Sequence, residues 1–210
     1  MRVLIVGGSG TVGRRLRAAL APAHEVLTAG RSSGDVRVDI RDADAIERMY
    51  RDLPPLDAVV GAAAEGALDD FATLTEGELH DNLRGKLYGQ VNLVLIGQRH
   101  VRPGGSFTLT SGIFADRPAR HVTAGGIISA AVHGFVLSAA LELQGRFRVN
   151  AVSPTMVEDS ADRFADIFPG LTPVPMDELT AYYRDLIEGS ETGRIVRAYG
   201  ARDTTHVENR

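Results

Sequence analysis

A glycine-rich stretch near the start of the chain limits its possible folds more than any other feature. Residues 3–6 form a short apolar run that predicts a buried parallel strand. Gly7, Gly10 and Gly13 follow at three-residue spacing, and a helical pattern opens at Arg14. Glycines let the backbone approach a pyrophosphate closely, and a helix N-terminus offers it unpaired N–H groups. The stretch therefore predicts a dinucleotide-binding turn, with a tight turn that binds nothing as the alternative.

The rest of the chain alternates between strand-like and helix-like segments, which is typical of an α/β doubly wound parallel sheet. We expect a single Rossmann-like domain over residues 1–200, with about seven strands and helices on both faces, and a polar C-terminal tail over residues 201–210. The expected strands are residues 3–6, 25–29, 36–40, 57–60, 106–110, 148–152 and 193–198. The expected helices are residues 14–21, 42–51, 75–100, 125–144, 159–168 and 177–188.

Ligands of such sheets bind beyond the carboxyl ends of the strands. Five turns should therefore meet at one crevice, namely residues 7–13, 30–33, 61–64, 110–112 and 153–159.

Composition narrows the possible functions. The net charge of −4 gives no electrostatic argument for binding nucleic acid or an anionic membrane. The absence of cysteine excludes disulfides, thiolate catalysis and zinc–cysteine sites. The apolar start is too short for a signal peptide, and no apolar run reaches transmembrane length. We expect a cytoplasmic protein whose partner is a small molecule.

Several blocks along the chain resemble the short-chain dehydrogenase/reductase family, and together they cover nearly its whole length. Their order and spacing are similar to those of the family, although the chain looks like a short bacterial branch of it. The blocks are Gly7–Gly13, Gly30-Arg31, Val38–Ile40, Gly61–Ala64, Thr110-Ser111, Ala130–Phe135, Ala139–Leu143 and Arg148–Pro154.

The resemblance implies a nicotinamide cofactor and a set of residues that hold it. The turn after the first strand would hold the pyrophosphate, and Asp39 and Ile40 would flank the adenine. Ala62 and Ala63 would lie beside the adenine ribose. The segment over residues 153–160, which includes Pro154, would cover the nicotinamide, with a backbone group near Val157 on its carboxamide. The pyrophosphate residues are Gly7, Ser9, Gly10, Thr11, Val12 and Gly13.

The second strand predicts which cofactor is preferred. NAD-binding members carry an acid at its end, which accepts a hydrogen bond from the ribose 2′-hydroxyl. This chain has Gly30 there, followed by Arg31, Ser32 and Ser33. A guanidinium and two hydroxyls suit a 2′-phosphate better than a neutral ribose, so we expect NADP. The alternative is that Arg31 is a solvated loop charge.

The catalytic residues of the family are largely missing. Its members use a serine, a tyrosine and a lysine four residues after the tyrosine. Ser111 matches the serine, either as a functional residue or as a strand-end hydroxyl bonded to the backbone. The tyrosine position is Gly125 and the lysine position is Ser129. A positioned general acid contributes about 10²–10⁴-fold, so its loss is serious.

Other residues could replace the missing proton donor, but each has a simpler interpretation. His121 fits an exposed loop histidine better than a donor near Ser111. Tyr182 and Tyr183 fit packing residues better than groups on a lid. Lys86, the single lysine of the chain, fits a solvated helix residue better than a catalytic one.

Three functions remain open. The first is an NADP(H)-dependent oxidoreductase that acts on a carbonyl or hydroxyl of a small molecule through a non-standard active site. The second is a non-redox enzyme on the same scaffold, such as a cyclase, dehydratase or isomerase. The third is a non-catalytic NADP-binding protein. The helix over residues 125–144 is apolar on more than one face, which predicts a homodimer or homotetramer.

Overall fold

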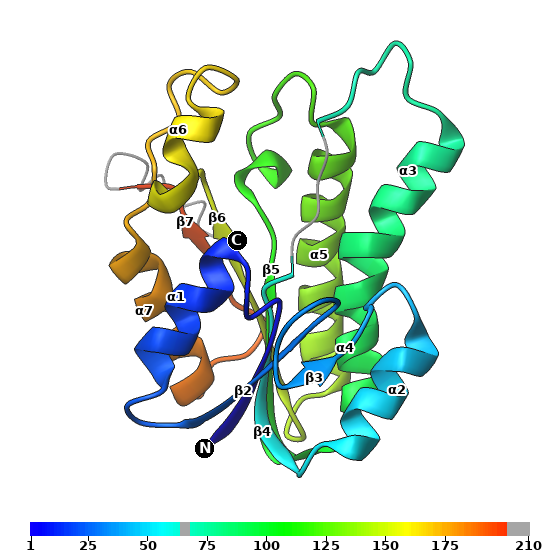
Figure 1. The fold of residues 1–210 in the computed structure, drawn as a ribbon, viewed down its shortest axis with the longest axis vertical. Helices are drawn as coiled ribbons and strands as arrows, with labels where there is room; N and C mark the ends of the chain where they lie inside the picture. Colours follow the sequence, from blue (N-terminus) through cyan, green and yellow to red (C-terminus); the bar gives the residue numbers. More distant parts are fainter. Residues whose placement is uncertain (64–67, 201–210) are drawn as a thin grey trace.

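The computed structural model describes residues 1–63 and 68–200, so the tail expected over residues 201–210 lies outside the described residues. Seven parallel strands form one sheet in the order β3-β2-β1-β4-β5-β6-β7 (Figure 1). The strands are β1 (Arg2–Val6), β2 (Glu25–Gly30), β3 (Val36–Arg37), β4 (Leu56–Gly61), β5 (Val101–Thr110), β6 (Arg148–Pro154) and β7 (Ile195–Ala198). The expected doubly wound α/β sheet is confirmed.

Helices cover both faces of this sheet (Figure 1). The α-helices are α1 (Thr11–Leu20), α2 (Ala43–Asp52), α3 (Glu76–Leu83), α4 (Gly89–Gly97), α5 (Thr123–Glu142), α6 (Ala161–Phe164) and α7 (Met176–Glu188). The alternation of β1 divides the core, since Val3 and Ile5 pack with residues of α1 and α7. Leu4 and Val6 face the opposite way, toward α2, α4 and α5.

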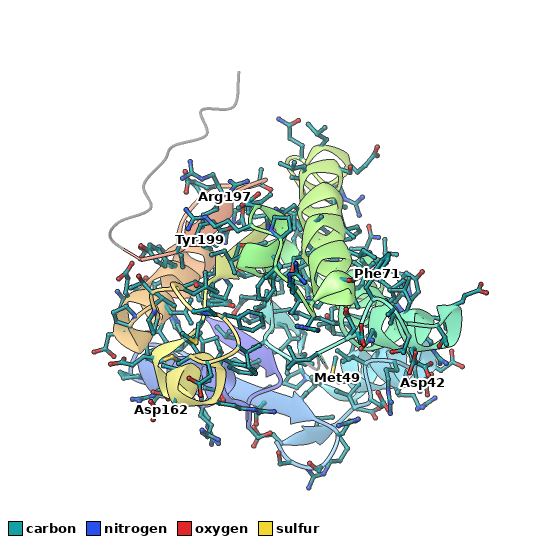
Figure 2. All side chains as sticks on the ribbon, turned by 90° about the horizontal axis from the view of Figure 1, so that it is seen from above. Asp42, Met49, Phe71, Asp162, Arg197 and Tyr199 are labelled. Atoms are coloured by element: carbon teal, nitrogen blue, oxygen red, sulfur yellow. The ribbon has the colours of Figure 1, made fainter. Side chains whose placement is uncertain are left out.

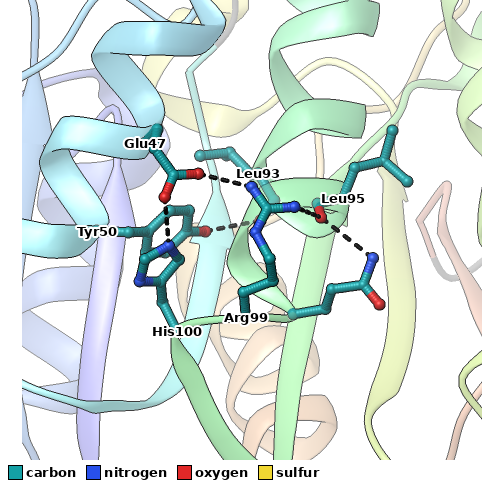
Figure 3. A network of polar contacts seen from close by, with 7 residues as sticks. Glu47, Tyr50, Leu93, Leu95, Arg99 and His100 are labelled. Atoms are coloured by element: carbon teal, nitrogen blue, oxygen red, sulfur yellow. Dashed lines mark hydrogen bonds and ion pairs between the residues drawn. The ribbon is translucent and has the colours of Figure 1, made fainter.

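Polar contacts hold α2 against the end of α4 and the turn that follows it (Figure 3). Glu47 accepts a hydrogen bond from Arg99 at 2.6 Å and lies 2.9 Å from His100. The buried Tyr50 hydroxyl donates to the Leu93 carbonyl at 2.7 Å, and the Tyr50 ring stacks on His100. Since the hydroxyl has a partner, the large ring can be buried without leaving a polar atom unpaired.

Helix α5 is long and apolar enough, by length and composition alone, to cross a membrane. It packs as a core helix, with Ile128, Val132 and Val136 buried. Its apolar character on that side is therefore explained by the sheet that it covers.

The helix expected over residues 75–100 is not continuous. Thr75 and Glu78 form the capping box that opens α3, as the sequence indicates. A π-helical turn, η1 (Arg84–Tyr88), then separates α3 from α4. Such a turn inserts an extra residue into the helical ladder, and it is frequent at functional sites.

The third strand is shorter than expected, because only Val36 and Arg37 pair with β2. The backbone then turns at Asp39, whose carbonyl accepts from the Asp42 amide at 3.1 Å. Asp42 in turn caps α2 by accepting from the Asp44 amide. Residues 38–40 therefore lie in a turn at the strand end.

Main-chain hydrogen bonds bring the strand ends together at one edge of the sheet. The Gly7 amide donates to Ala29 at 2.7 Å, and the Ala62 amide donates to Val6 at 2.8 Å. Beyond β5, the Ser111 amide donates to Val152 at 2.9 Å. Turns that are far apart in sequence thus meet where the sequence predicts.

Gly13 is required by the close packing of α1 on the glycine turn. A Cβ at this position would lie 2.1 Å from the Gly7 carbonyl oxygen, which no real Cβ contact tolerates. We expect Gly13→Ala to lower the free energy of unfolding by about 1–3 kcal/mol, as overpacking does elsewhere. Urea denaturation measures this change.

Gly134 is the matched control, since it is an exposed residue inside α5 and its Cβ would meet nothing within 4 Å. Gly134→Ala should stabilise the protein by about 0.5–1 kcal/mol through helix propensity. Equal behaviour of the two variants would contradict the packing role of Gly13.

Candidate functional site

A cavity of about 590 Å³ opens at the carboxyl ends of the strands, within the size range of ligand sites. The turns after β1, β2, β4, β5 and β6 all contribute to its wall. Most of the predicted site residues line it, namely Gly7, Ser9, Gly10, Thr11, Val12, Arg31, Ser32, Asp39, Ile40, Ala62, Ala63, Ser111, Pro154 and Val157. Gly13 and Ser33 do not line this cavity.

The glycine turn has the shape that a pyrophosphate needs. Gly7 has a φ of +92°, and a Cβ there would lie 2.5 Å from the Ala63 nitrogen. Gly10 precedes α1 without any side-chain cap on the first turn of that helix. The N-terminus of α1 therefore faces the cavity with backbone N–H groups and the positive end of its dipole, so the residues present fit a dinucleotide.

The turn after β2 brings cations to the other end of the cavity. Arg31 lines this cavity and also a neighbouring one of about 420 Å³. Asp39 forms an ion pair with Arg41 at 2.6 Å, and the Arg41 guanidinium lowers the pKa of that carboxyl. Arg41 also lines the cavity, although the sequence analysis did not single it out.

The opposite end of the cavity is lined by Lys86, Ser111, Gly125 and Ser129, and we call it the reaction end. The Ser111 hydroxyl donates to the Ser129 carbonyl at 3.0 Å. This is the strand-end backbone bond that the sequence analysis left open. A Cβ on Gly125 would lie 3.6 Å from its nearest neighbour, an ordinary contact distance, so a Cβ fits there without a clash.

A buried amide holds the end of β5 in place. The Gln90 side chain accepts from the Thr110 amide at 2.7 Å and donates to the Thr110 carbonyl at 2.9 Å. The Thr110 hydroxyl donates to the Gly61 carbonyl and lies 2.6 Å from the Tyr183 hydroxyl. Ser111 therefore follows a residue whose backbone and side chain are both fixed.

Tyr183 is a packing residue, as the simpler interpretation predicts. It is completely buried, and burial raises the pKa of its hydroxyl. Its neighbour Tyr182 donates to Glu178 at 2.7 Å, and neither tyrosine lines the cavity. Helix α7 packs beside α1 on one face of the sheet and is not a lid (Figure 1). His121 is exposed, as expected.

The prediction for Lys86 was wrong. Its side chain is half-buried and lines the cavity, and burial lowers the pKa of its amine. Lys86 lies inside the π-helical turn. The extra residue in that turn rotates the side chains around the helix axis relative to a regular α-helix. Regular helical spacing, the only guide that the sequence offers, does not reveal such a turn.

Aromatic side chains form another part of the cavity wall. Phe114 and Phe168 lie with ring centroids 5.0 Å apart, and Phe164 packs on Phe168 at 6.3 Å. All three line the cavity, with the Arg163 guanidinium over the Phe164 ring. The cavity thus has an apolar side for the body of a ligand.

Asp69 is a structural residue of the site that the sequence analysis missed. It is buried, and its carboxylate accepts from the Thr123 and Ala124 amides at 2.9 and 2.8 Å. It therefore caps α5, the helix that carries Gly125, from a distant segment of the chain. A cap 54 residues away from Thr123 leaves no local sequence signal.

The segment after β6 is tied down by two carboxylates. Asp159 forms a two-point ion pair with Arg15 of α1, at 2.8 and 2.7 Å. Glu158 accepts from the Met176 amide at 3.3 Å, at the start of α7. These contacts anchor the segment that begins at Pro154 to both helices on that face.

A second polar cluster lies at the end of β7, where Arg197 and Tyr199 are neighbours (Figure 2). Both donate to Asp116, each at 2.6 Å. Burial and the Asp116 carboxylate raise the pKa of Tyr199 to about 12, so its hydroxyl keeps its proton at neutral pH. Because these three residues do not line the cavity, the cluster secures the loop after β5.

The fold and the cavity define a dinucleotide-binding α/β protein, and comparison with known proteins identifies its family. A family model described as enoyl-(acyl carrier protein) reductase matches residues 11–177. The chain belongs to the short-chain dehydrogenase/reductase family. No curated protein matches the chain.

Solved structures agree with this assignment. The protein lin1944 from Listeria innocua is 37% identical, with a TM-score of 0.92 over 95% of this chain and 100% of its own. A small-chain dehydrogenase in complex with NADPH is 22% identical, with a TM-score of 0.82 over 94% and 96% of the two chains. A glucose/ribitol dehydrogenase-type member from Brucella melitensis is 18% identical, with a TM-score of 0.81 over 95% of each chain. The last two likenesses concern the fold.

Proposed function

We propose that the protein is an NADP(H)-dependent oxidoreductase that acts on a carbonyl or hydroxyl group of a small molecule through a non-standard active site. One observation carries this proposal: the glycine turn, Ser111 and the segment after β6 line one continuous cavity. When bound, the reduced cofactor supplies a hydride. The residues around the cavity then bind, orient and protonate the substrate.

The choice of NADP over NAD is supported by the charge at the adenosine end. Arg31 and Ser32 line the cavity where the family's acid is absent, and Arg41 adds a second guanidinium nearby. Planar guanidinium groups bind phosphate through paired hydrogen bonds. A family member of the same fold is an NADPH complex, which agrees with this choice.

Arg31→Ala should weaken NADPH binding by about 1–3 kcal/mol, the size of a charge-assisted hydrogen bond. NADH affinity should stay unchanged, because NADH has no 2′-phosphate. Cofactor fluorescence titration measures both values. Arg51→Ala, an exposed arginine of α2 away from the cavity, is the matched control. An equal loss for both cofactors would contradict contact with the 2′-phosphate.

Because the tyrosine and lysine are missing, the first question for experiment is whether the protein catalyses hydride transfer. Turnover of NADPH with a panel of aldehydes and ketones supports the oxidoreductase. Saturable NADPH binding without turnover would instead favour a non-redox enzyme or a non-catalytic NADP-binding protein. No NADPH binding would refute the proposed function.

Restoring the family's pair gives a gain-of-function test. A Cβ fits at Gly125 without a clash, and both Gly125 and Ser129 line the reaction end. We expect Gly125→Tyr with Ser129→Lys to raise NADPH-dependent carbonyl reduction, because it restores the tyrosine and lysine that the family uses as its acid. Gly125→Phe with Ser129→Lys has the same bulk without the hydroxyl. Equal rates in the two double variants would show that the restored acid is not used.

We also propose that the protein is cytoplasmic and assembles as a homodimer or homotetramer through α4 and α5. Exposed apolar side chains lie on both helices, at Leu95, Ile127, Leu137 and Leu141. Leu141 is 75% exposed, although it lies in an apolar helix. Covering such a patch with the same patch of a second copy is the usual solution in symmetric oligomers.

Leu141→Glu should shift the protein toward a monomer of 22.5 kDa, because a buried unpaired carboxylate destabilises the interface. Light scattering coupled to gel filtration measures the mass. Ile167→Glu changes an exposed apolar residue beyond α6 and should keep the wild-type mass. A monomeric wild-type protein would refute the proposed assembly.

A further inference from the structure

We propose that Lys86 is the proton donor at the reaction end of the cavity, in place of the tyrosine and lysine that positions 125 and 129 lack. The proposal rests on the proposed oxidoreductase function. Its geometric basis is that Lys86, Ser111, Gly125 and Ser129 line the same cavity. The side chains missing from α5 leave this end open, and the single lysine of the chain reaches it from the π-helical turn.

Gln90 fixes Lys86 relative to Ser111. One amide nitrogen of its side chain donates both to the Lys86 carbonyl at 3.2 Å and to the Thr110 carbonyl at 2.9 Å. Gln90 is completely buried. Its bond to Thr110 is buried and its bond to Lys86 is partly buried. The main chain of Lys86 is therefore held beside the end of β5, where the family's serine lies.

Ser111 is a poor candidate for the same role. Its proton is directed to the Ser129 carbonyl, which leaves the Ser111 oxygen as an acceptor toward the cavity. A serine hydroxyl is also too weak an acid to donate its proton to the substrate unless a charged group lies beside it. Lys86 carries three donor hydrogens on an ammonium group.

No carboxylate within residues 1–63 and 68–200 forms an ion pair with Lys86. Burial lowers the pKa of the Lys86 amine below its ordinary value, which makes the ammonium group a stronger acid. The turn packs against α3, α4 and α5. The charged and titratable side chains of these helices and of the cavity wall are Glu76, Glu78, His80, Asp81, His133, Glu142, Arg31, Asp39, Arg41 and Arg163. Burial, and none of these groups, is the cause of the lowered pKa.

The proton transfer balances without a further reagent. A carbonyl group that has accepted a hydride at carbon carries a negative charge on oxygen. The Nζ–H bond of Lys86 breaks as the new O–H bond forms, so the product is a neutral alcohol and Lys86 is left as a neutral amine. Water then returns a proton to the amine. In the direction of oxidation, the neutral amine accepts the alcohol proton.

The single lysine allows a direct measurement of this group. Reductive methylation with ¹³C-formaldehyde labels two amines, Lys86 and the N-terminus, and Lys86→Arg assigns the two NMR signals. We expect the Lys86 signal to titrate below the ordinary lysine pKa of about 10.4. Saturation with NADPH should shift that signal, because the cofactor occupies the same cavity. A titration at the ordinary value, or no response to bound NADPH, would overturn the proposal.

Lys86→Met with Arg84→Lys is the matched control. It moves the lysine by two positions to an exposed site on the same turn. The relocated lysine should titrate as an ordinary lysine and ignore NADPH. If it behaves like Lys86, the response is not specific to the cavity, and the proposal fails.

Kinetic measurements provide the second test, with NADPH and benzaldehyde as the substrates. The Gly125→Tyr, Ser129→Lys double variant checks that the cavity accepts benzaldehyde. Lys86→Met should lower kcat by about 10²–10⁴-fold, the contribution of a general acid, while NADPH still binds. Wild-type kcat should fall as the pH rises through the pKa of Lys86 measured by NMR. A fully active Lys86→Met variant that binds NADPH overturns the role of Lys86 alone. If the wild-type protein does not bind NADPH, the proposed function is overturned as well.

Discussion

The parallel pairing of β1 with its neighbours is the constraint on which the rest of this molecule depends. Parallel strands end at the same edge of a sheet, so every connection that follows a strand begins at that edge. Residues from Gly7 to Val157 therefore meet around one cavity although they are spread over most of the chain. Gly13 makes this possible on one side, since a larger residue would push α1 away from the turn.

The two ends of the cavity differ in how they are built. Around the glycine turn the cavity wall is mostly backbone, formed by that turn and by the first turn of α1. At the reaction end the chemistry depends on side chains, and the resemblance assigns the family's tyrosine and lysine to the positions of Gly125 and Ser129. A binding site made of backbone survives changes of side chain, whereas proton transfer depends on single groups. Cofactor binding and catalysis can therefore diverge separately on one fold.

The sequence predicts the fold well, and it predicts most of the residues that line the cavity, because both follow from local patterns. Apolar runs, caps such as Asp42 and Thr75, and spaced glycines each act within a few residues. The features that it misses arise from long-range contacts, such as the Asp69 carboxylate on the first turn of α5. The position of Lys86 depends on one extra residue in a helical turn, which no periodicity indicates. Tertiary packing decides these points.

The partial burial of Lys86 is unfavourable for the free energy of folding, and this cost needs an explanation. Lys86 is half-buried, and moving an ammonium group even partly out of water costs free energy unless a partner compensates it. A residue with only a structural role could be replaced there by an apolar one at no cost. The cost is compensated if an oxygen that becomes negative during the reaction lies beside Lys86, because the attraction is strongest in a site from which water is excluded. The same desolvation that destabilises the ammonium group makes it a better acid, so the position that is unfavourable for folding is favourable for proton transfer.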